Sequence, residues 1–384
     1  MLAKLWIRNA ARHPLRTALT LVAVGVAILA FGLLGTLVEA WHAGVAAASA
    51  NRLVVRHGIS LTFSLPLAYR EKIRGLEAVR AITHMTWFGG FFRERKNFFA
   101  NFAVEAPTFF EHYPEYRLSE AERAAFLRDR RGCVVGRALA ERFGWKVGDA
   151  VPLQGTIYPG VWTFTVRGIY TGRDRGTDEN QFFFHWDILN ERLLERMPPR
   201  ANRVGIFVIE VRRAEDAPEA AIAVDALFRS SPAETRTETE RAFQMGFVSM
   251  SAAILAAIRV VSLVIVVILL AVVANTMIMS VRERMREYAV LKTLGFGPGF
   301  LTALILGESI ALCAAGGALG TAALYPALEI LERSLGAYFP AVEPAPETLL
   351  LGGLACLVVG ALAAAFPVRA VLSTPIVQAL GRVG

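Results

Sequence analysis

The sequence predicts a membrane protein with four transmembrane α-helices and a large α+β extracytoplasmic domain inserted between the first and the second. Hydrophobic residues make up 54% of its 384 residues and the mean hydropathy is +0.44, well above the values of a soluble domain. The stretch between the first two apolar runs has the short alternating pattern of strands. Four runs are long enough to cross about 30 Å of hydrocarbon, at 17–38, 260–281, 300–328 and 348–368.

Lysine and arginine near the ends of these runs set their orientation, because cytoplasmic flanks carry an excess of both. The N-terminal segment, the loop 282–299 and the tail 369–384 are basic, so both termini and this loop are expected in the cytoplasm. The connection 329–347 carries four glutamates and one arginine and is expected outside. The long segment between the first two runs is therefore expected on the opposite side of the membrane. With an outer membrane assumed, the chain is expected in the cell inner membrane with its large domain in the periplasm. Without an outer membrane, that domain would face the cell exterior.

The first elements are an interfacial helix and a transmembrane helix. Residues 1–16 are expected to form an amphipathic helix on the cytoplasmic surface, and Pro14 allows a bend into the first span at 17–40. This run is longer than the apolar part of a signal peptide, so we expect it to be retained. The alanine-rich stretch after Trp41 leaves cleavage as the alternative.

The segment 41–245 is predicted to fold as a mixed α+β domain large enough to bury its own core. Alternating apolar residues between turns predict strands at 52–56, 79–87, 101–105, 161–170 and 204–211. Helices are predicted at 67–74, 119–130, 136–143 and 215–228. Ser119 and Glu122 have the spacing of a capping box at the start of the second helix.

Aromatic residues gather at 87–92 and 98–102, where core packing is favoured over a hydrophobic contact surface. The loops 158–160 and 173–180 are expected to be mobile. Cys133 is the only cysteine of this segment, so no disulfide is expected within it.

Residues 246–281 are expected to combine a stalk with the second transmembrane helix. One interpretation is a single helix from 237 to 281 that extends beyond the bilayer and transmits displacement between its ends. The alternative is two helices with a bend near Gly246.

The loop 282–299 is predicted to contain an amphipathic helix over 282–294. The apolar positions that share one face are Met285, Tyr288, Ala289 and Leu291. The charged positions around the rest are Arg282, Arg284, Arg286, Glu287 and Lys292. Gly295 can take the left-handed conformation that ends a helix, and the triplet at 297–299 cannot continue one. The alternative to a functional helix is a solvated connector whose arginines only follow the excess of basic residues in cytoplasmic loops. The third and fourth transmembrane helices follow at 300–328 and 348–368.

No pattern typical of a catalytic or metal site occurs. The sequence lacks a GxxxxGK[ST] phosphate loop, an HExxH, a GxSxG and a CxxC. The six histidines have no ligand spacing, and each is expected at a surface or interface. The basic flanks give no nucleic-acid signature. We therefore expect a non-catalytic chain that binds no metal, cofactor or nucleic acid.

Glu308 is the one ionisable residue well inside an apolar run, and Ser309 follows it. An intramembrane acid is a candidate functional residue, with a hydrogen-bonded packing role as the favoured alternative. Small residues along the same run would let another helix approach closely, in a tight bundle or at a subunit interface.

Three segments, one near each end of the chain and one between them, share the pattern of a known family. They are residues 6–21 (WIRNAARHPLRTALTL), 282–309 (RERMREYAVLKTLGFGPGFLTALILGES) and 366–380 (FPVRAVLSTPIVQAL). Together they resemble the permease subunit of the MacB/FtsX-type ABC transporter family, which includes the LolC/LolE permeases. The inserted segment resembles this family more weakly, at residues 51–66 and 134–153.

This resemblance implies a permease subunit, and the sequence departs from the MacB arrangement in lacking a fused ATPase domain. A separate ATPase dimer would carry ATP and Mg²⁺ and would bind the cytoplasmic loop as its coupling helix. The implied coupling residues are Arg282, Arg284, Glu287, Leu291, Leu294, Gly295 and Phe296. A second permease chain, identical or a paralogue, would complete the dimer among membrane lipids. ATP-driven closure would move the coupling helix, and the long helices would carry the motion outwards by mechanotransmission.

Two functions from different classes fit this family. The first is export of a hydrophobic, peptide or lipid-linked substrate from the periplasmic side, with a membrane fusion protein and an outer-membrane channel as partners. The second is an FtsX-like transmitter that activates a cell-wall hydrolase and moves no substrate. An outer domain of about 200 residues favours the exporter. A membrane enzyme centred on Glu308 lacks a second catalytic residue near it.

Overall fold

A computed structural model describes residues 6, 12–174, 176–335 and 344–375. The chain divides into two compact units. The helical unit comprises residues 1–39, 252–333 and 342–384, and the inserted domain comprises 40–251 with 334–341. Most of the predicted interfacial helix 1–16, the centre of the connection 329–347 and the end of the tail 369–384 lie outside the described residues.

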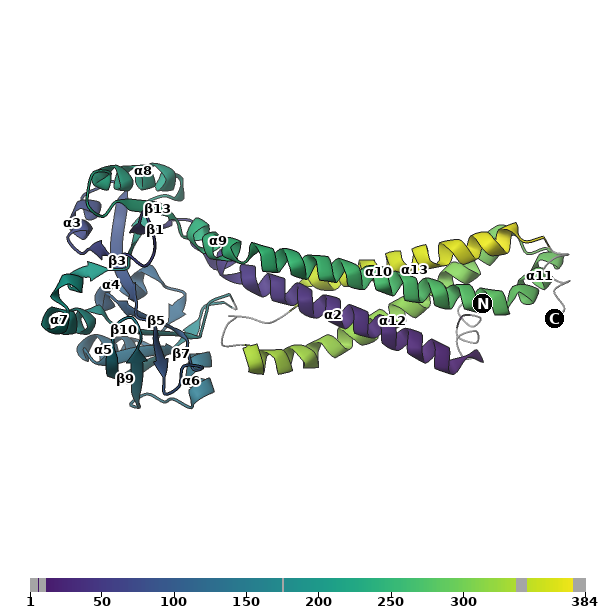
Figure 1. Ribbon diagram of the computed structural model, residues 1–384, viewed down its shortest axis with the longest axis horizontal. Coiled ribbons are helices and arrows are strands. Elements are labelled where there is room, and N and C mark those ends of the chain that lie inside the picture. The colour runs from purple at the N-terminus through teal and green to yellow at the C-terminus, as the bar shows by residue number, and fades with distance from the viewer. Residues whose placement is uncertain (1–5, 7–11, 175, 336–343, 376–384) are drawn as a thin grey trace. The chain divides into compact units, whose positions relative to one another are not determined.

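The helical unit contains the four helices that the sequence predicts. Among the described residues, four helices are long and apolar enough to cross a membrane. They belong to α2 (Pro14–Ala47), α10 (Ala252–Glu283), α12 (Pro298–Leu335) and α13 (Pro346–Ser373). A short helix, α11 (Met285–Thr293), lies between α10 and α12 in the sequence. In Figure 1, α10 runs alongside α13.

Glycines of α12 let neighbouring helices approach closely. A Cβ atom on Gly320 would collide with the carbonyl oxygen of Gly25 in α2, and one on Gly316 would lie 2.6 Å from the Cβ of Val24. On another side of α12, a Cβ on Gly317 would lie 2.5 Å from Sγ of Cys356 in α13. The small residues predicted to permit close packing therefore bring α2 and α13 against α12 within one chain.

The inserted domain is built on one 11-stranded sheet in the order β13-β1-β12-β3-β5-β10-β7-β9-β8-β4, with β6 paired to β9. Its strands are β1 (Arg52–His57), β3 (Val79–Trp87), β4 (Gly90–Phe92), β5 (Ala100–Val104), β6 (Tyr116–Arg117), β7 (Gly132–Gly136), β8 (Ala150–Gly155), β9 (Gly160–Gly172), β10 (Gln181–His185), β12 (Ile206–Val211) and β13 (Thr235–Thr239). The pairs β5–β10 and β7–β9 are parallel and the other pairs are antiparallel. A separate pair joins β2 (Leu65–Pro66) to β11 (Arg203–Val204).

Helices cover the sheet, and both of its faces are buried. They are α3 (Tyr69–Arg74), α4 (Ala106–His112), α5 (Glu120–Arg128), α6 (Arg137–Phe143), α7 (Trp186–Arg196), α8 (Ala217–Phe228) and α9 (Glu240–Met250), with 3₁₀ turns η1 (Pro198–Arg200) and η2 (Ala214–Asp216). Successive residues of β1 belong to different cores, since Leu53 and Val55 pack in one and Val54 in the other. The capping box of Ser119 and Glu122 is confirmed.

Core packing is also confirmed for most of the two aromatic clusters. Phe88, Phe92 and Phe99 lie in the larger core. Trp87 and Phe98 remain 40% exposed and contact each other with ring centroids 5.9 Å apart.

The structure has two helices here, as in the second interpretation, but the break between them lies at Ser251 and not at Gly246. Residues 235–239 form β13, because Thr237 is held to Asp225 by its backbone and its hydroxyl while the strand pairs with β1. The Thr239 side chain then caps α9 at Ala242 N–H. This helix passes through Gly246 and ends at Met250, and α10 begins at Ala252.

Candidate functional site

The short helix α11 is defined by its ends. It follows a break at Arg284, whose backbone leaves the helical region at φ −105° and ψ 13°. At the other end, Gly295 has φ +87°. The Gly295 N–H donates to the carbonyl of Lys292, and the Phe296 N–H donates to the carbonyl of Leu291. These two bonds form a Schellman motif, so the predicted left-handed cap at Gly295 is confirmed.

The apolar face predicted for this helix is buried against the helical unit. Tyr288 and Ala289 are 1% and 2% exposed, and Met285 and Leu291 pack against the same core. The amphipathic prediction therefore holds for these four positions, and the helix is seated on the bundle rather than free in solvent.

Arg284 does not lie on the charged face, where the sequence pattern placed it. Its side chain is buried, and Nη1 donates to Oε2 of Glu308 at 2.8 Å. The break before α11 takes this residue out of the helical pattern, and the buried acid in α12 compensates its charge. The guanidinium also lies 5.3 Å from the Tyr288 ring and 3.4 Å from Glu287.

Further polar contacts attach α11 and the end of α10 to the other helices. Glu287 accepts a hydrogen bond from Arg12, and both carboxylate oxygens of Glu283 accept from Arg16 at 2.7 Å. Lys292 donates to the carbonyl oxygens of Val371 at 2.6 Å and Thr374 at 3.0 Å. These two acceptors lie at the end of α13, where a helix leaves carbonyl groups without internal partners and favours a cation.

Ser309 joins α12 to α13. It is fully buried, and its hydroxyl donates to the carbonyl of Gly360 at 2.7 Å. Glu308 and Ser309 are therefore adjacent residues that connect α12 to two different parts of the chain, Arg284 before α11 and Gly360 in α13. The hydrogen-bonded packing role favoured for Glu308 fits this geometry, and its partner Arg284 is the feature that sequence reasoning missed.

Three apolar side chains at the end of α11 stay outside the core. Val290 is 47% exposed, Leu294 is 69% exposed and Phe296 is 41% exposed. Arg282 and Arg286 are exposed nearby in the sequence. We call Val290, Leu294 and Phe296 the apolar tip. Of the predicted coupling residues, the structure thus leaves Arg282, Glu287, Leu294, Gly295 and Phe296 exposed, half-buries Leu291 and buries Arg284.

The histidines were expected at surfaces or interfaces, and this is wrong for four of them. His57, His84, His112 and His185 are buried in the inserted domain. Aromatic packing accounts for part of this, since the rings of His84 and His185 contact Trp186 and Phe126. Within the described residues, no group of three or more histidine, cysteine or acidic side chains has the arrangement of a metal site.

Two family models match the chain in sequence order. The MacB-like periplasmic core domain matches residues 17–227, and the FtsX-like permease C-terminal domain matches residues 259–376. No curated protein sequence matches the chain.

Solved structures resemble part of the chain at low identity. The periplasmic region of MacB from Actinobacillus actinomycetemcomitans is 9% identical, with 53% of this chain and 95% of that chain covered and a TM-score of 0.38. The extracellular domain of the noncanonic ABC-type transporter YknZ from Gram-positive bacteria is 10% identical, with 49% and 99% covered and a TM-score of 0.36. Since the periplasmic-core model alone matches more than half of the sequence, the chain belongs to the MacB/FtsX-type family of ABC transporter permeases.

Proposed function

We propose that this chain is the permease subunit that couples a separate ATPase dimer to work on the periplasmic side of the inner membrane. The observation that carries the proposal is the apolar tip on α11. This helix is fixed to the bundle through Arg284, Glu287 and Lys292, yet it leaves Leu294 69% exposed in the loop expected in the cytoplasm. An exposed apolar group on an anchored element is suited to fill a pocket of a partner protein.

ATP and Mg²⁺ would be bound by the ATPase subunits, and the apolar tip would enter them with Arg282 and Arg286 at its rim. Closure of the ATPase dimer would displace α11. The ion pair of Arg284 with Glu308 would transfer the displacement to α12, and Lys292 would transfer it to α13. The helices would then carry it to the inserted domain.

We propose export of a hydrophobic, peptide or lipid-linked substrate over signalling, because the inserted segment 41–245 has about 200 residues. Export would involve a second permease chain, identical or a paralogue, together with a membrane fusion protein and an outer-membrane channel. In the alternative, the same motion would activate a cell-wall hydrolase. ATP-dependent release of substrate from proteoliposomes supports export, whereas hydrolase activation without release supports signalling.

The docking role is tested by Leu294→Asp in the full-length permease with its ATPase. Because truncating a central apolar anchor typically costs 2 kcal/mol or more, we expect the affinity for the ATPase to fall by about tenfold or more. Thr293→Asp is the matched control, since it places the same charge on the neighbouring exposed polar position and should leave the affinity close to wild type. Unchanged ATPase binding and coupling in Leu294→Asp would overturn the proposal.

A further inference from the structure

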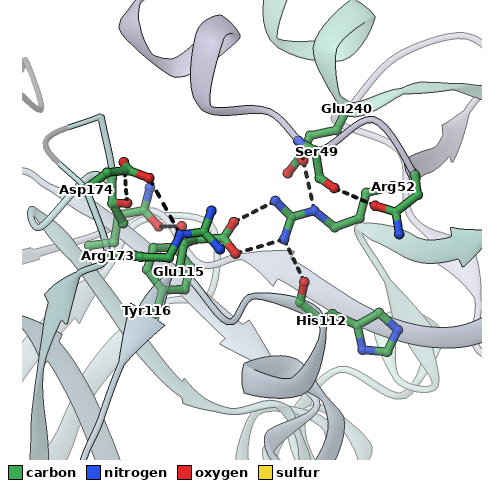
Figure 2. A network of polar contacts seen from close by, with 11 residues as sticks. Ser49, Arg52, His112, Glu115, Tyr116, Arg173, Asp174 and Glu240 are labelled. Atoms are coloured by element: carbon green, nitrogen blue, oxygen red, sulfur yellow. Dashed lines mark hydrogen bonds and ion pairs between the residues drawn. The ribbon is translucent and has the colours of Figure 1, made fainter. Parts of the chain in front are cut away.

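The two segments that connect the inserted domain to the helical unit meet at Glu240. The chain enters the domain after α2, and it leaves through α9, whose first residue is Glu240. The backbone N–H of Ser49 donates to Oε2 of this carboxylate at 2.9 Å. The Nε–H of Arg52 donates to the same oxygen, also at 2.9 Å (Figure 2). The entering and leaving segments are thus joined through one carboxylate.

Arg52 also reaches a third segment. Its Nη2 donates to Oε1 of Glu115 at 2.5 Å, and its Nη1 donates to Oε2 of Glu115 at 3.1 Å and to the carbonyl of His112 at 2.6 Å. The guanidinium lies 4.3 Å from the centre of the Tyr113 ring. A planar guanidinium can bind the Glu115 carboxylate through its two Nη atoms while its Nε binds Glu240, and a lysine ammonium group cannot make both contacts in this way.

Glu115 belongs to a different part of the sheet from Arg52. The adjacent residue Tyr116 lies in β6, which pairs with β9, and the N–H of Arg173 at the end of β9 donates to the carbonyl of Glu115 at 2.8 Å (Figure 2). In the sheet order, β13 and β1 lie at one end and β9 lies six strands beyond β1. Arg52 therefore connects the entry and exit segments directly to the opposite half of the domain.

These charges are almost fully removed from solvent. The side chains of Arg52, Glu240 and Glu115 are 5%, 7% and 16% exposed. Burial raises the pKa of the Glu240 carboxyl above its usual value, although Arg52 opposes the shift. Buried ion pairs often contribute little net stability compared with apolar packing, so stability alone does not account for this network.

We propose that Arg52 is a positioning residue that makes the entry and exit segments move as one body with residues 113–117, and so delivers motion of α9 to the far half of the inserted domain. This inference rests on the proposed function, because it assigns a residue to the transmission of motion. Arg56 provides the contrast. It lies on the same strand and pairs with Glu238 of β13 at 2.7 Å, so its ion pair joins only neighbouring strands.

The experiment is hydrogen exchange with mass spectrometry on the full-length permease bound to its ATPase in nanodiscs, with and without ATP and vanadate. The variants are Glu115→Gln, which leaves Arg52 paired with Glu240, and Arg52→Lys, which keeps the charge but loses the fork. Arg56→Gln is the matched control. Thermal unfolding of each variant separates loss of stability from loss of coupling, and if one test variant fails to assemble, the other decides.

In the wild type and in Arg56→Gln, nucleotide should change the exchange of residues 240–250 and 113–117 together. In Glu115→Gln and Arg52→Lys, the effect of nucleotide on the exchange of residues 240–250 should persist. The effect of nucleotide on the exchange of residues 113–117 should fall by about tenfold, as expected for loss of a charge-assisted contact. A change at 113–117 equal to that of the wild type would overturn the role of Arg52. No nucleotide effect at either segment of the wild type would instead refute the proposed function.

Discussion

Replacing Arg284 by glutamine should release α11 from the bundle. The side chains of Arg284 and Glu308 are 9% and 6% exposed and their charged atoms lie 2.8 Å apart. Removing one partner of a buried pair costs about 3–5 kcal/mol, because the other charge stays buried. The contact with Glu287 contributes less than about 1 kcal/mol, since that side chain is 47% exposed.

Glutamine retains a hydrogen-bond donor, so we take the lower end of this range, about 3 kcal/mol. That energy corresponds to a factor of about a hundred in the equilibrium between docked and undocked α11. Hydrogen exchange of the amides at 288–294 measures this equilibrium directly, and exchange should accelerate by the same factor while the rest of the bundle remains protected.

Two further variants control this prediction. The double variant Arg284→Gln, Glu308→Gln removes both charges and should recover much of the protection. Arg12→Gln removes an exposed partner of Glu287, and it should change the free energy of undocking α11 by less than about 1 kcal/mol. Two results would refute the view that this pair holds α11. One is exchange in Arg284→Gln that matches the wild type, and the other is exchange in the double variant as fast as in Arg284→Gln.

Two other predictions test separate features. Gly295→Ala should destabilise the end of α11 by about 1–2 kcal/mol, because a Cβ there has free space but φ is +87°. Gly299→Ala, with open space and no positive φ, is the control, and equal effects of the two in thermal unfolding would argue against backbone strain. Burial opposes ionisation of Glu105, but contacts led by His84 outweigh it and lower the pKa of this carboxyl. The ionised Glu105 carboxylate therefore contributes to the free energy of unfolding above its unfolded-state pKa of about 4.3, and this contribution is lost as pH falls through its lower pKa in the folded state. Glu105→Gln should make the free energy of unfolding, measured by chemical unfolding, fall less steeply at acid pH. A fall as steep as that of the wild type would contradict this assignment.

Local signals in the sequence were sufficient where one segment determines its own structure. Residues 79–87 alternate and form β3 at the predicted bounds. Gly295 ends α11 as expected, because a left-handed cap needs only the glycine and its own helix. The apolar face of α11 followed from helical spacing for the same reason.

The features that depend on distant partners could not be predicted in this way. Residues 181–185 form β10, a central strand buried on both faces, so they show an aromatic run rather than alternation. Arg284 and Glu308 are 24 residues apart, and nothing in the helical pattern joins them. The forked contact of Arg52 with Glu115 and Glu240 likewise requires the folded sheet.

In the proposed function, α11 docks a separate ATPase through its apolar tip. Native mass spectrometry of the full-length chain, extracted from its own membrane under conditions that preserve complexes, tests this claim most directly. We expect the permease to carry bound ATPase subunits, and Leu294→Asp to lose them while Thr293→Asp keeps them. A wild-type chain isolated without any ATPase, or a Leu294→Asp variant that retains it fully, would contradict the account.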